Sequence, residues 1–211
     1  NPAGFTSTAA NPVVSPTVNT TYTVTVTIGS GTTCADTDNA LVSVLIPPTA
    51  DAGADQDICP GTSVQIGVAP TAGFTYSWTP TAGLSNTNIA NPIATPVSPT
   101  TYTVQITETA TGCVNTDAMN ITFNAVPTPT FTVSNTCINQ ITAFTDASTI
   151  ATGSITAWAW DFDDAGATST LQNPTHQFSA AGTYQVKLVV TSNLGCKDSI
   201  TTPITIDPKP T

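Results

Sequence analysis

The chain has 211 residues, with 13 acidic groups against 3 basic ones, a formal net charge of −10 and only 8% charged residues. An acidic chain repels phosphate backbones and anionic lipid, which excludes nucleic-acid binding. No stretch approaches about 18 uninterrupted apolar residues, the length of a membrane helix, which excludes membrane insertion. Threonine, valine and isoleucine are abundant and 39% of residues are hydrophobic, a composition typical of a folded all-β protein.

One set of landmarks occurs three times, with a period close to 80 residues. In each copy an Asn-Pro pair precedes a tyrosine by eleven residues, the tyrosine opens a Thr-Tyr-x-Val strand, and a cysteine follows that strand. The tyrosines are Tyr22, Tyr102 and Tyr184, and the cysteines are Cys34, Cys113 and Cys196. Such repetition predicts tandem copies of one small domain.

The strand that each tyrosine opens alternates apolar and polar residues, which is the pattern of a half-buried strand. In the first copy, Tyr22, Val24 and Val26 share one face, while threonines occupy the other. The second and third copies also have a tryptophan 24 residues before the tyrosine, on a strand expected to pack against the tyrosine strand. The predicted core aromatic residues are therefore Trp78, Trp160, Tyr22, Tyr102 and Tyr184.

The third copy carries three further motifs in order: W-D-F-D-D at residues 160–164, N-P-T-H-Q-F at residues 173–178 and G-T-Y-Q-V at residues 182–186. This series resembles the PKD domain family, whose pattern is W-D-F-G-D-G, N-P-x-H-x-Y/F and G-x-Y-x-V. Asp163 stands where the family has a glycine, so the turn after the tryptophan strand must be built differently.

The resemblance carries expectations about fold and role. It implies a seven-stranded β-sandwich with a binding, spacing or structural role and no catalytic site. The second copy is similar to related Ig-like or PKD-like repeats. Such repeats are common in large surface proteins of Bacteroidota, including adhesins exported by the type IX system.

Proline-rich stretches set the expected domain boundaries. Residues 1–47 are read as the C-terminal part of an incomplete Ig-like repeat, because they lack a tryptophan strand. Residues 48–127 are expected to form an Ig-like/PKD-like β-sandwich, residues 128–208 a PKD domain, and residues 209–211 the start of a linker to a following repeat. The predicted fold class is all-β, with tandem sandwiches in an elongated array, because short proline linkers are stiff.

Half a sandwich cannot bury its own apolar face, so the first repeat needs strands from elsewhere. Either the array continues in both directions along one chain, or filament subunits complete one another's sandwiches by donated strands. The sequence leaves both alternatives open.

Five cysteines in a strand-rich chain indicate an oxidising, extracellular setting. In an Ig-type sandwich, the early cysteine (Cys59 or Cys137) lies at one end and the late one (Cys113 or Cys196) at the other, roughly 20 Å away along a strand. A disulfide spans Cα atoms no more than about 7 Å apart. The preferred pairing is therefore Cys59 with Cys196 between domains, which leaves Cys34, Cys113 and Cys137 for flanking domains. The alternatives are the pairs Cys59–Cys113 and Cys137–Cys196 within domains, or free thiols.

Few residues are candidates for catalysis, metal binding or covalent modification. His176 is the single histidine and is interpreted as a packed turn residue, and no nucleophile, base and acid occur at a catalytic spacing, so the chain is not expected to be an enzyme. Carboxylates are calcium ligands, and no other cofactor is expected. The candidate calcium ligands are Asp51, Asp55 and Asp57 beside a linker, and Asp161, Asp163 and Asp164 in the turn after the tryptophan strand. Ser199 lies in an Asp-Ser-Ile triplet that resembles an O-glycosylation motif of Bacteroidota.

The sequence thus predicts a structural segment at the cell surface, the shaft of a large extracellular adhesin or filament, which provides length and stiffness. The expected partners are neighbouring repeats of the same chain or neighbouring filament subunits, and in addition surface glycans or proteins. The alternative function is a non-catalytic accessory module of a secreted hydrolase that binds polysaccharide or protein. That alternative predicts an exposed aromatic strip.

Overall fold

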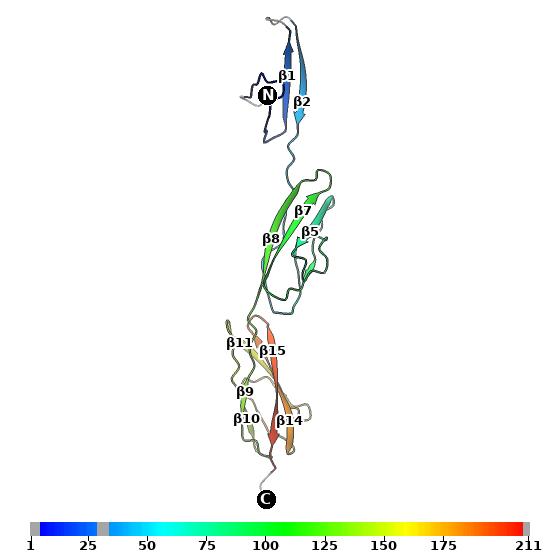
Figure 1. The fold of residues 1–211 in the computed structure, drawn as a ribbon. Helices are drawn as coiled ribbons and strands as arrows, with labels where there is room; N and C mark the ends of the chain where they lie inside the picture. Colours follow the sequence, from blue (N-terminus) through cyan, green and yellow to red (C-terminus); the bar gives the residue numbers. More distant parts are fainter. Residues whose placement is uncertain (1–4, 29–33, 209–211) are drawn as a thin grey trace.

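The computed structural model describes residues 5–28 and 34–208. All regular secondary structure in these ranges is β-strand, which confirms the predicted all-β class. The described residues accordingly contain no helix that could cross a bilayer. A hairpin and two sandwiches follow one another along a single long axis (Figure 1).

The first part is a two-stranded antiparallel hairpin, formed by β1 (Thr20–Thr27) and β2 (Ala35–Val42). Tyr22 lies opposite Ala40, and Val24 lies opposite Asp38. Directly opposed residues share one face of an antiparallel pair. Within the described ranges, neither outer edge of this hairpin is paired with a third strand.

The middle sandwich, formed by the strands from β3 to β8, combines a four-stranded sheet, in the order β3-β8-β7-β5, with the small sheet β4-β6. Strand β3 runs parallel to β8, whereas β5, β7 and β8 form antiparallel pairs. The strands are β3 (Gln56–Ile58), β4 (Val64–Gln65), β5 (Phe74–Thr79), β6 (Ile93–Ala94), β7 (Thr100–Glu108) and β8 (Val114–Phe123).

The C-terminal sandwich, formed by the strands from β9 to β15, pairs a sheet in the order β13-β10-β9 with a sheet in the order β12-β11-β14-β15. Its seven strands match the strand number that the resemblance implied. They are β9 (Phe131–Ser134), β10 (Thr142–Asp146), β11 (Ile155–Asp161), β12 (Thr168–Ser169), β13 (Thr175–His176), β14 (Gly182–Ser192) and β15 (Lys197–Ile206).

Each sandwich has its own hydrophobic core. Trp78, Tyr102 and Trp160 are fully buried. Tyr184 is half-buried at the edge of its core, and Tyr22 of the hairpin is also only half-buried. The buried tryptophans keep their indole N–H groups satisfied, as a buried donor requires. Trp78 donates to the carbonyl of Ile89 at 2.9 Å and Trp160 to that of Leu171 at 2.9 Å.

The turn after Trp160 is built without the family's glycine. Asp163 and Ala165 adopt φ angles of 57° and 51°, a left-handed backbone that is unfavourable for residues with a side chain. The backbone N–H of Asp163 donates to Asp161 Oδ1 at 3.0 Å, and the Asp163 carboxylate accepts the N–H of Gln185 at 2.9 Å. Carboxylate hydrogen bonds therefore stabilise a conformation that a glycine would adopt without help.

Candidate functional site

The junction between the two sandwiches is bridged by a disulfide. Cys59 and Cys196, 137 residues apart in sequence, are bonded with their Cα atoms 5.4 Å apart. Cys59 directly follows Ile58, which pairs with Phe123 at the end of β8 from which the linker leaves. Cys196 lies in the turn between β14 and β15, at the end of the C-terminal sandwich that faces the middle one (Figure 1).

The two alternative pairings within domains are wrong in this structure. Cys113 and Cys137 are free thiols, as is Cys34. The physical reason is the one that favoured the bridge between domains. The two cysteines of one sandwich lie at opposite ends of its strands, whereas the facing ends of neighbouring sandwiches are close together.

Both bonded cysteines lie in turns that are fixed by hydrogen bonds. The carbonyl of Cys59 accepts the backbone N–H of Thr62 at 3.1 Å and its hydroxyl at 2.7 Å. The N–H of Ser192 donates to the carbonyl of Cys196 at 2.8 Å, and the N–H of Cys196 donates to Ser192 Oγ at 3.1 Å. Cys196 is only 1% exposed although it lies in a hairpin turn. The disulfide thus joins two rigid turns.

The peptide linker beside the disulfide is also held on both sides. The N–H of Asn124 donates to the carbonyl of Ile58 at 2.9 Å in the middle sandwich. The N–H of Thr128 donates to the carbonyl of Thr149 at 2.7 Å, and the return bond measures 3.0 Å, in the C-terminal sandwich. Only residues 125–127 lie between these anchors. Two covalent connections therefore join the sandwiches, and they oppose both bending and twisting of the junction.

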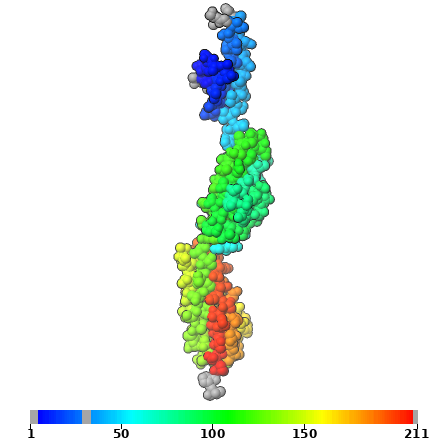
Figure 2. Space-filling model, in the orientation of Figure 1, coloured from blue at the N-terminus to red at the C-terminus, as the bar shows by residue number. Residues whose placement is uncertain are grey.

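The space-filling view shows the two sandwiches in direct contact, whereas the hairpin is connected through a thin neck (Figure 2). At the neck, Asn115 Nδ2 donates to the carbonyl of Pro48 at 2.9 Å. Leu45 and Ile46 just before it are exposed, and among the described residues no disulfide crosses this neck. The two junctions of the chain are therefore built differently.

The first acidic cluster, Asp51, Asp55 and Asp57, follows the neck, and its carboxylates accept hydrogen bonds within the middle sandwich. Asp55 accepts the backbone N–H of Asn120 at 2.7 Å and its side-chain amide at 3.2 Å. These two hydrogen bonds, the backbone one first, hold the pKa of Asp55 below its ordinary value. Asp57 accepts the hydroxyl of Thr122, and Asp51 accepts the N–H of Gly53 at 2.8 Å. Each carboxylate has its own protein donor, so the geometry gives the predicted calcium site no support.

The second acidic cluster also divides into separate contacts. Asp164 Oδ1 accepts the hydroxyl of Ser179 at 2.8 Å, and its Oδ2 lies 3.0 Å from Nε2 of His176. His176 stacks on Phe162 with ring centroids 4.5 Å apart. Across residues 5–28 and 34–208, no group of three or more His, Cys, Asp or Glu side chains is placed to hold a metal. The calcium prediction for Asp161, Asp163 and Asp164 is likewise without structural support.

The contacts of Asp164 do not form a catalytic arrangement. In a nucleophilic triad, the histidine lies between the serine and the acid. Here Ser179 and His176 each bind the carboxylate, and no hydrogen bond joins them to each other in the described structure. Asp164 is therefore a tie between the turn after β11 and the segment around β13.

We expect the C-terminal sandwich to lose stability in acid through Asp164. The hydroxyl of Ser179, followed by His176, holds the pKa of Asp164 below its ordinary value. A lowered folded-state pKa contributes stability above the unfolded-state pKa of about 4, and this contribution is lost as the pH falls through the lower folded-state value. Between pH 6 and pH 2, the melting temperature should fall less for Asp164→Asn than for the wild type.

The exposed residue Asp207 provides the matched control for this experiment. Asp207→Asn should leave the pH profile of the wild type unchanged. An equal fall of the melting temperature in acid for the wild type and Asp164→Asn would contradict a stabilising role of the Asp164 carboxylate.

No aromatic platform is exposed. Among the described residues, the large exposed hydrophobic side chains are all valine, isoleucine or leucine. Trp158, the most exposed tryptophan, is half-buried and donates its indole N–H to Asp146 Oδ2 at 2.8 Å. Burial raises the pKa of Asp146, but hydrogen bonds from Ser148, Gln172 and Trp158 outweigh this effect and hold it below its ordinary value. Ser199 is exposed on β15, and its glycosylation stays a prediction.

Sequence reasoning missed the residues that anchor the junction. Asn115, Asn124 and Thr128 hold the two linkers, yet no motif distinguishes them from other polar residues in the chain. For Asn124 and Thr128 the one available signal was their position beside Pro127 and Pro129, where a backbone group can fasten a linker to its domain. Asn115 lies in β8, far along the chain from the linker that it holds, and no feature of the sequence indicated it.

The C-terminal sandwich has seven strands, a buried Trp160 and a His176 that stacks on Phe162. Residues 124–207 match the PKD domain family. The hairpin and most of the middle sandwich lie outside the matched residues, and the C-terminal sandwich is called the PKD domain below.

The chain is similar to proteins of known structure or function. A microbial collagenase of Vibrio alginolyticus is 41% identical over 67 residues, which are 32% of this chain and 8% of the collagenase. The solved PKD1 domain of the Vibrio cholerae metalloprotease PrtV is 30% identical, with 39% of this chain and 98% of that domain covered and a TM-score of 0.36. The Ig domains of Down syndrome cell adhesion molecule are 14% identical, with 89% of this chain and 31% of that structure covered and a TM-score of 0.47.

Proposed function

We propose that this chain is a stiff spacer segment in the shaft of a large extracellular adhesin or surface filament. The observation that carries the proposal is the disulfide between Cys59 and Cys196, which adds a second covalent connection to a junction already held by its linker. A catalytic or ligand-binding role does not require such a connection. A spacer benefits from one, because its length is useful only if its joints resist bending.

The setting of the spacer follows from its chemistry. Disulfides persist in oxidising compartments, which favours an extracellular location. PKD domains are non-catalytic accessory modules that occur in secreted proteins. A location at the cell surface, and export by the type IX system of Bacteroidota, rest on the sequence resemblance alone.

The free thiols suit the same role. Cys113 lies in the turn between β7 and β8, and Cys137 forms a backbone bridge with Asp207 near the end of the PKD domain. These positions correspond to the late and early cysteines of the bridged pair. We therefore assign Cys34, Cys113 and Cys137 to equivalent bridges with neighbouring repeats or filament subunits.

A second candidate function is an accessory module of a secreted hydrolase, which the similarity to the collagenase favours. Binding of polysaccharide by such a module commonly uses exposed aromatic faces, and the described residues expose none. The spacer role is therefore the better supported of the two.

The test is whether the two sandwiches tumble as one body. Residual dipolar couplings of the wild-type chain should fit one alignment tensor for the middle sandwich and the PKD domain together. In the Cys59→Ser/Cys196→Ser variant, the two sandwiches should require different tensors. Separate tensors in the oxidised wild type would refute the spacer role, and retention of the chain on collagen or insoluble polysaccharide would favour the accessory module.

A further inference from the structure

The hairpin exposes a face that the middle sandwich buries with the same residues. Residues 20–24 and 100–104 are both T-T-Y-T-V. In the middle sandwich, Tyr102 and Val104 are 0% and 1% exposed. In the hairpin, the equivalent Val24 is 57% exposed, and Val26 on the same face is 60% exposed. The hairpin is therefore built to have this face covered.

The middle sandwich shows which element covers it. Strand β5 pairs antiparallel with the outer edge of β7, and Trp78 lies opposite Val104 while Tyr76 lies opposite Ile106. The equivalent edge of β1 has no partner strand in the part of the chain that the structure describes. The same register on β1 would place a tryptophan opposite Val24.

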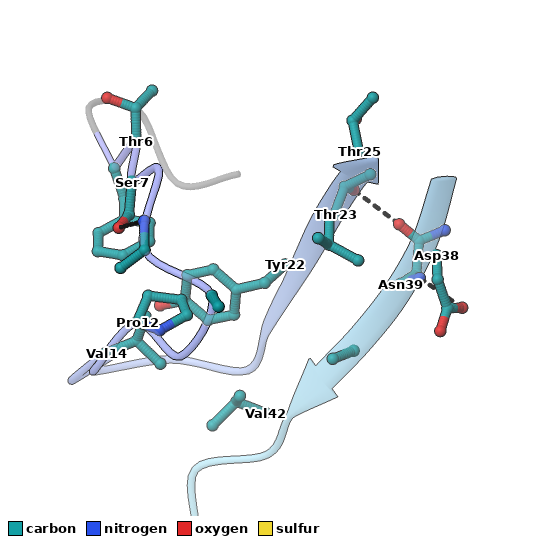
Figure 3. Close-up of a pocket in the computed structure, with 15 residues that line it drawn as sticks. Thr6, Ser7, Pro12, Val14, Tyr22, Thr23, Thr25, Asp38, Asn39 and Val42 are labelled. Atoms are coloured by element: carbon teal, nitrogen blue, oxygen red, sulfur yellow. Dashed lines mark hydrogen bonds between the residues drawn. The ribbon is translucent and has the colours of Figure 1, made fainter. Parts of the chain in front are cut away.

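A groove is present where that tryptophan would lie. It measures about 580 Å³ and is lined on one side by β1 and β2 and on the other by residues 5–14 (Figure 3). Phe5 closes one part of it by an edge contact with Tyr22, with ring centroids 5.7 Å apart. The lining is mainly apolar, with Tyr22, Val24 and Val42 from the hairpin.

A polar group for an incoming backbone is present as well. Asp117 lies opposite Val104 and accepts the backbone N–H of Ala52 at 2.8 Å, which fixes the segment that enters the middle sandwich. Asp38 lies opposite Val24, at the same place in the hairpin, and lines the groove. Strand β5 contains no acidic residue. A donated strand of this type would therefore bring no like charge close to Asp38.

We propose that the hairpin is an acceptor for a donated β-strand of the β5 type, an uncharged strand with aromatic residues at alternate positions. The donated strand pairs antiparallel with β1, places its tryptophan opposite Val24 and covers the exposed face by β-augmentation. The donor is a strand with the sequence character of β5, that is, with tyrosine and tryptophan at alternate positions and no charged residue. It is not β5 of a second copy, because Trp78 is fully buried in its own core.

A peptide with the sequence of residues 74–83, F-T-Y-S-W-T-P-T-A-G, tests the proposal on the full chain. Titration followed by amide NMR should give saturable shifts of the β1 resonances. The peptide with Trp78→Ser should bind at least tenfold more weakly. N-methylation of the peptide on its pairing edge should abolish the shifts, because it removes the backbone hydrogen bonds without any change in the protein.

Matched protein variants separate the two faces of β1. Val24→Lys should abolish binding, whereas Thr25→Lys, on the opposite face, should leave it intact. Binding that Trp78→Ser and N-methylation leave unchanged would overturn the proposal, as would the absence of shifts at millimolar peptide. A dimer of the chain that forms without peptide and is broken by Val24→Lys would also overturn it, because the face would then bind a second copy. None of these results depends on the rigidity of the junction, which tests the spacer role separately.

Discussion

Replacement of Trp160 by alanine will unfold the PKD domain or leave it barely stable. Trp160 is 2% exposed, and its ring centroid lies 5.0 Å from that of Phe131 and 5.5 Å from that of Phe144. Truncation of a buried tryptophan to alanine costs about 3–5 kcal/mol. A domain of this size has a total free energy of unfolding of about 4–12 kcal/mol. The loss therefore approaches the whole stability of the domain.

Calorimetry of the Trp160→Ala variant should show that the loss of stability is confined to the PKD domain. The measurement belongs in the Cys59→Ser/Cys196→Ser background, so that the disulfide does not couple the two sandwiches. The transition of the middle sandwich should stay in place while that of the PKD domain is lost or falls steeply. Leu171→Ala, at an exposed position of the same domain, should change stability by no more than about 0.5 kcal/mol.

A shift of both transitions in Trp160→Ala would contradict the proposed division of the chain near residue 127. The two sandwiches would then form one cooperative unit. The separate hydrophobic cores argue for two units, because no residue belongs to both clusters.

Removal of the disulfide will have the second large effect. In the oxidised chain, the disulfide and the linker both attach the middle sandwich to the PKD domain. Residues 59–128 therefore remain closed into a loop by the folded PKD domain when the middle sandwich unfolds. A loop of this kind stabilises the folded state by about 2–4 kcal/mol, mainly because it restricts the unfolded chain. Cys59→Ser/Cys196→Ser should therefore lower the melting temperature of the middle sandwich by roughly 10–30 °C.

Differential scanning calorimetry of the oxidised wild type and the double variant provides this measurement. Cys113→Ser is the matched control, since Cys113 is a free thiol of the same sandwich, and it should melt like the wild type. A peptide map without reductant should join Cys59 to Cys196. Identical melting temperatures of the wild type and the double variant would show that the disulfide does not stabilise the middle sandwich.

Local patterns in the sequence determined much of the fold. Alternation of apolar and polar residues identified the strands led by Tyr102 and Tyr184, and their spacing from Trp78 and Trp160 located the two cores. These features are readable because side-chain orientation in a strand repeats every two residues and needs no distant contact. The prediction that the first repeat is incomplete has the same basis, since residues 1–47 contain no tryptophan.

The register of the strands was decided only by the tertiary structure. Both tryptophans precede their tyrosine by 24 residues. Nevertheless, Trp78 lies opposite Val104, two residues after Tyr102, whereas Trp160 lies opposite Leu188, four residues after Tyr184. Equal spacing along the chain does not fix pairing across a sheet, because the turn between the strands sets the register.

The site was determined partly by the sequence and partly by the fold. The sequence supplied the cysteines and the geometric reason to prefer Cys59 with Cys196, but it left other pairings open. Only the three-dimensional arrangement brought these residues, 137 positions apart, to a Cα distance of 5.4 Å. It also turned the predicted calcium ligands into separate hydrogen-bond acceptors, because the donors that reach Asp55 and Asp164 come from distant strands and loops. Patterns along the chain fix local structure, whereas contacts between distant segments exist only once the chain has folded.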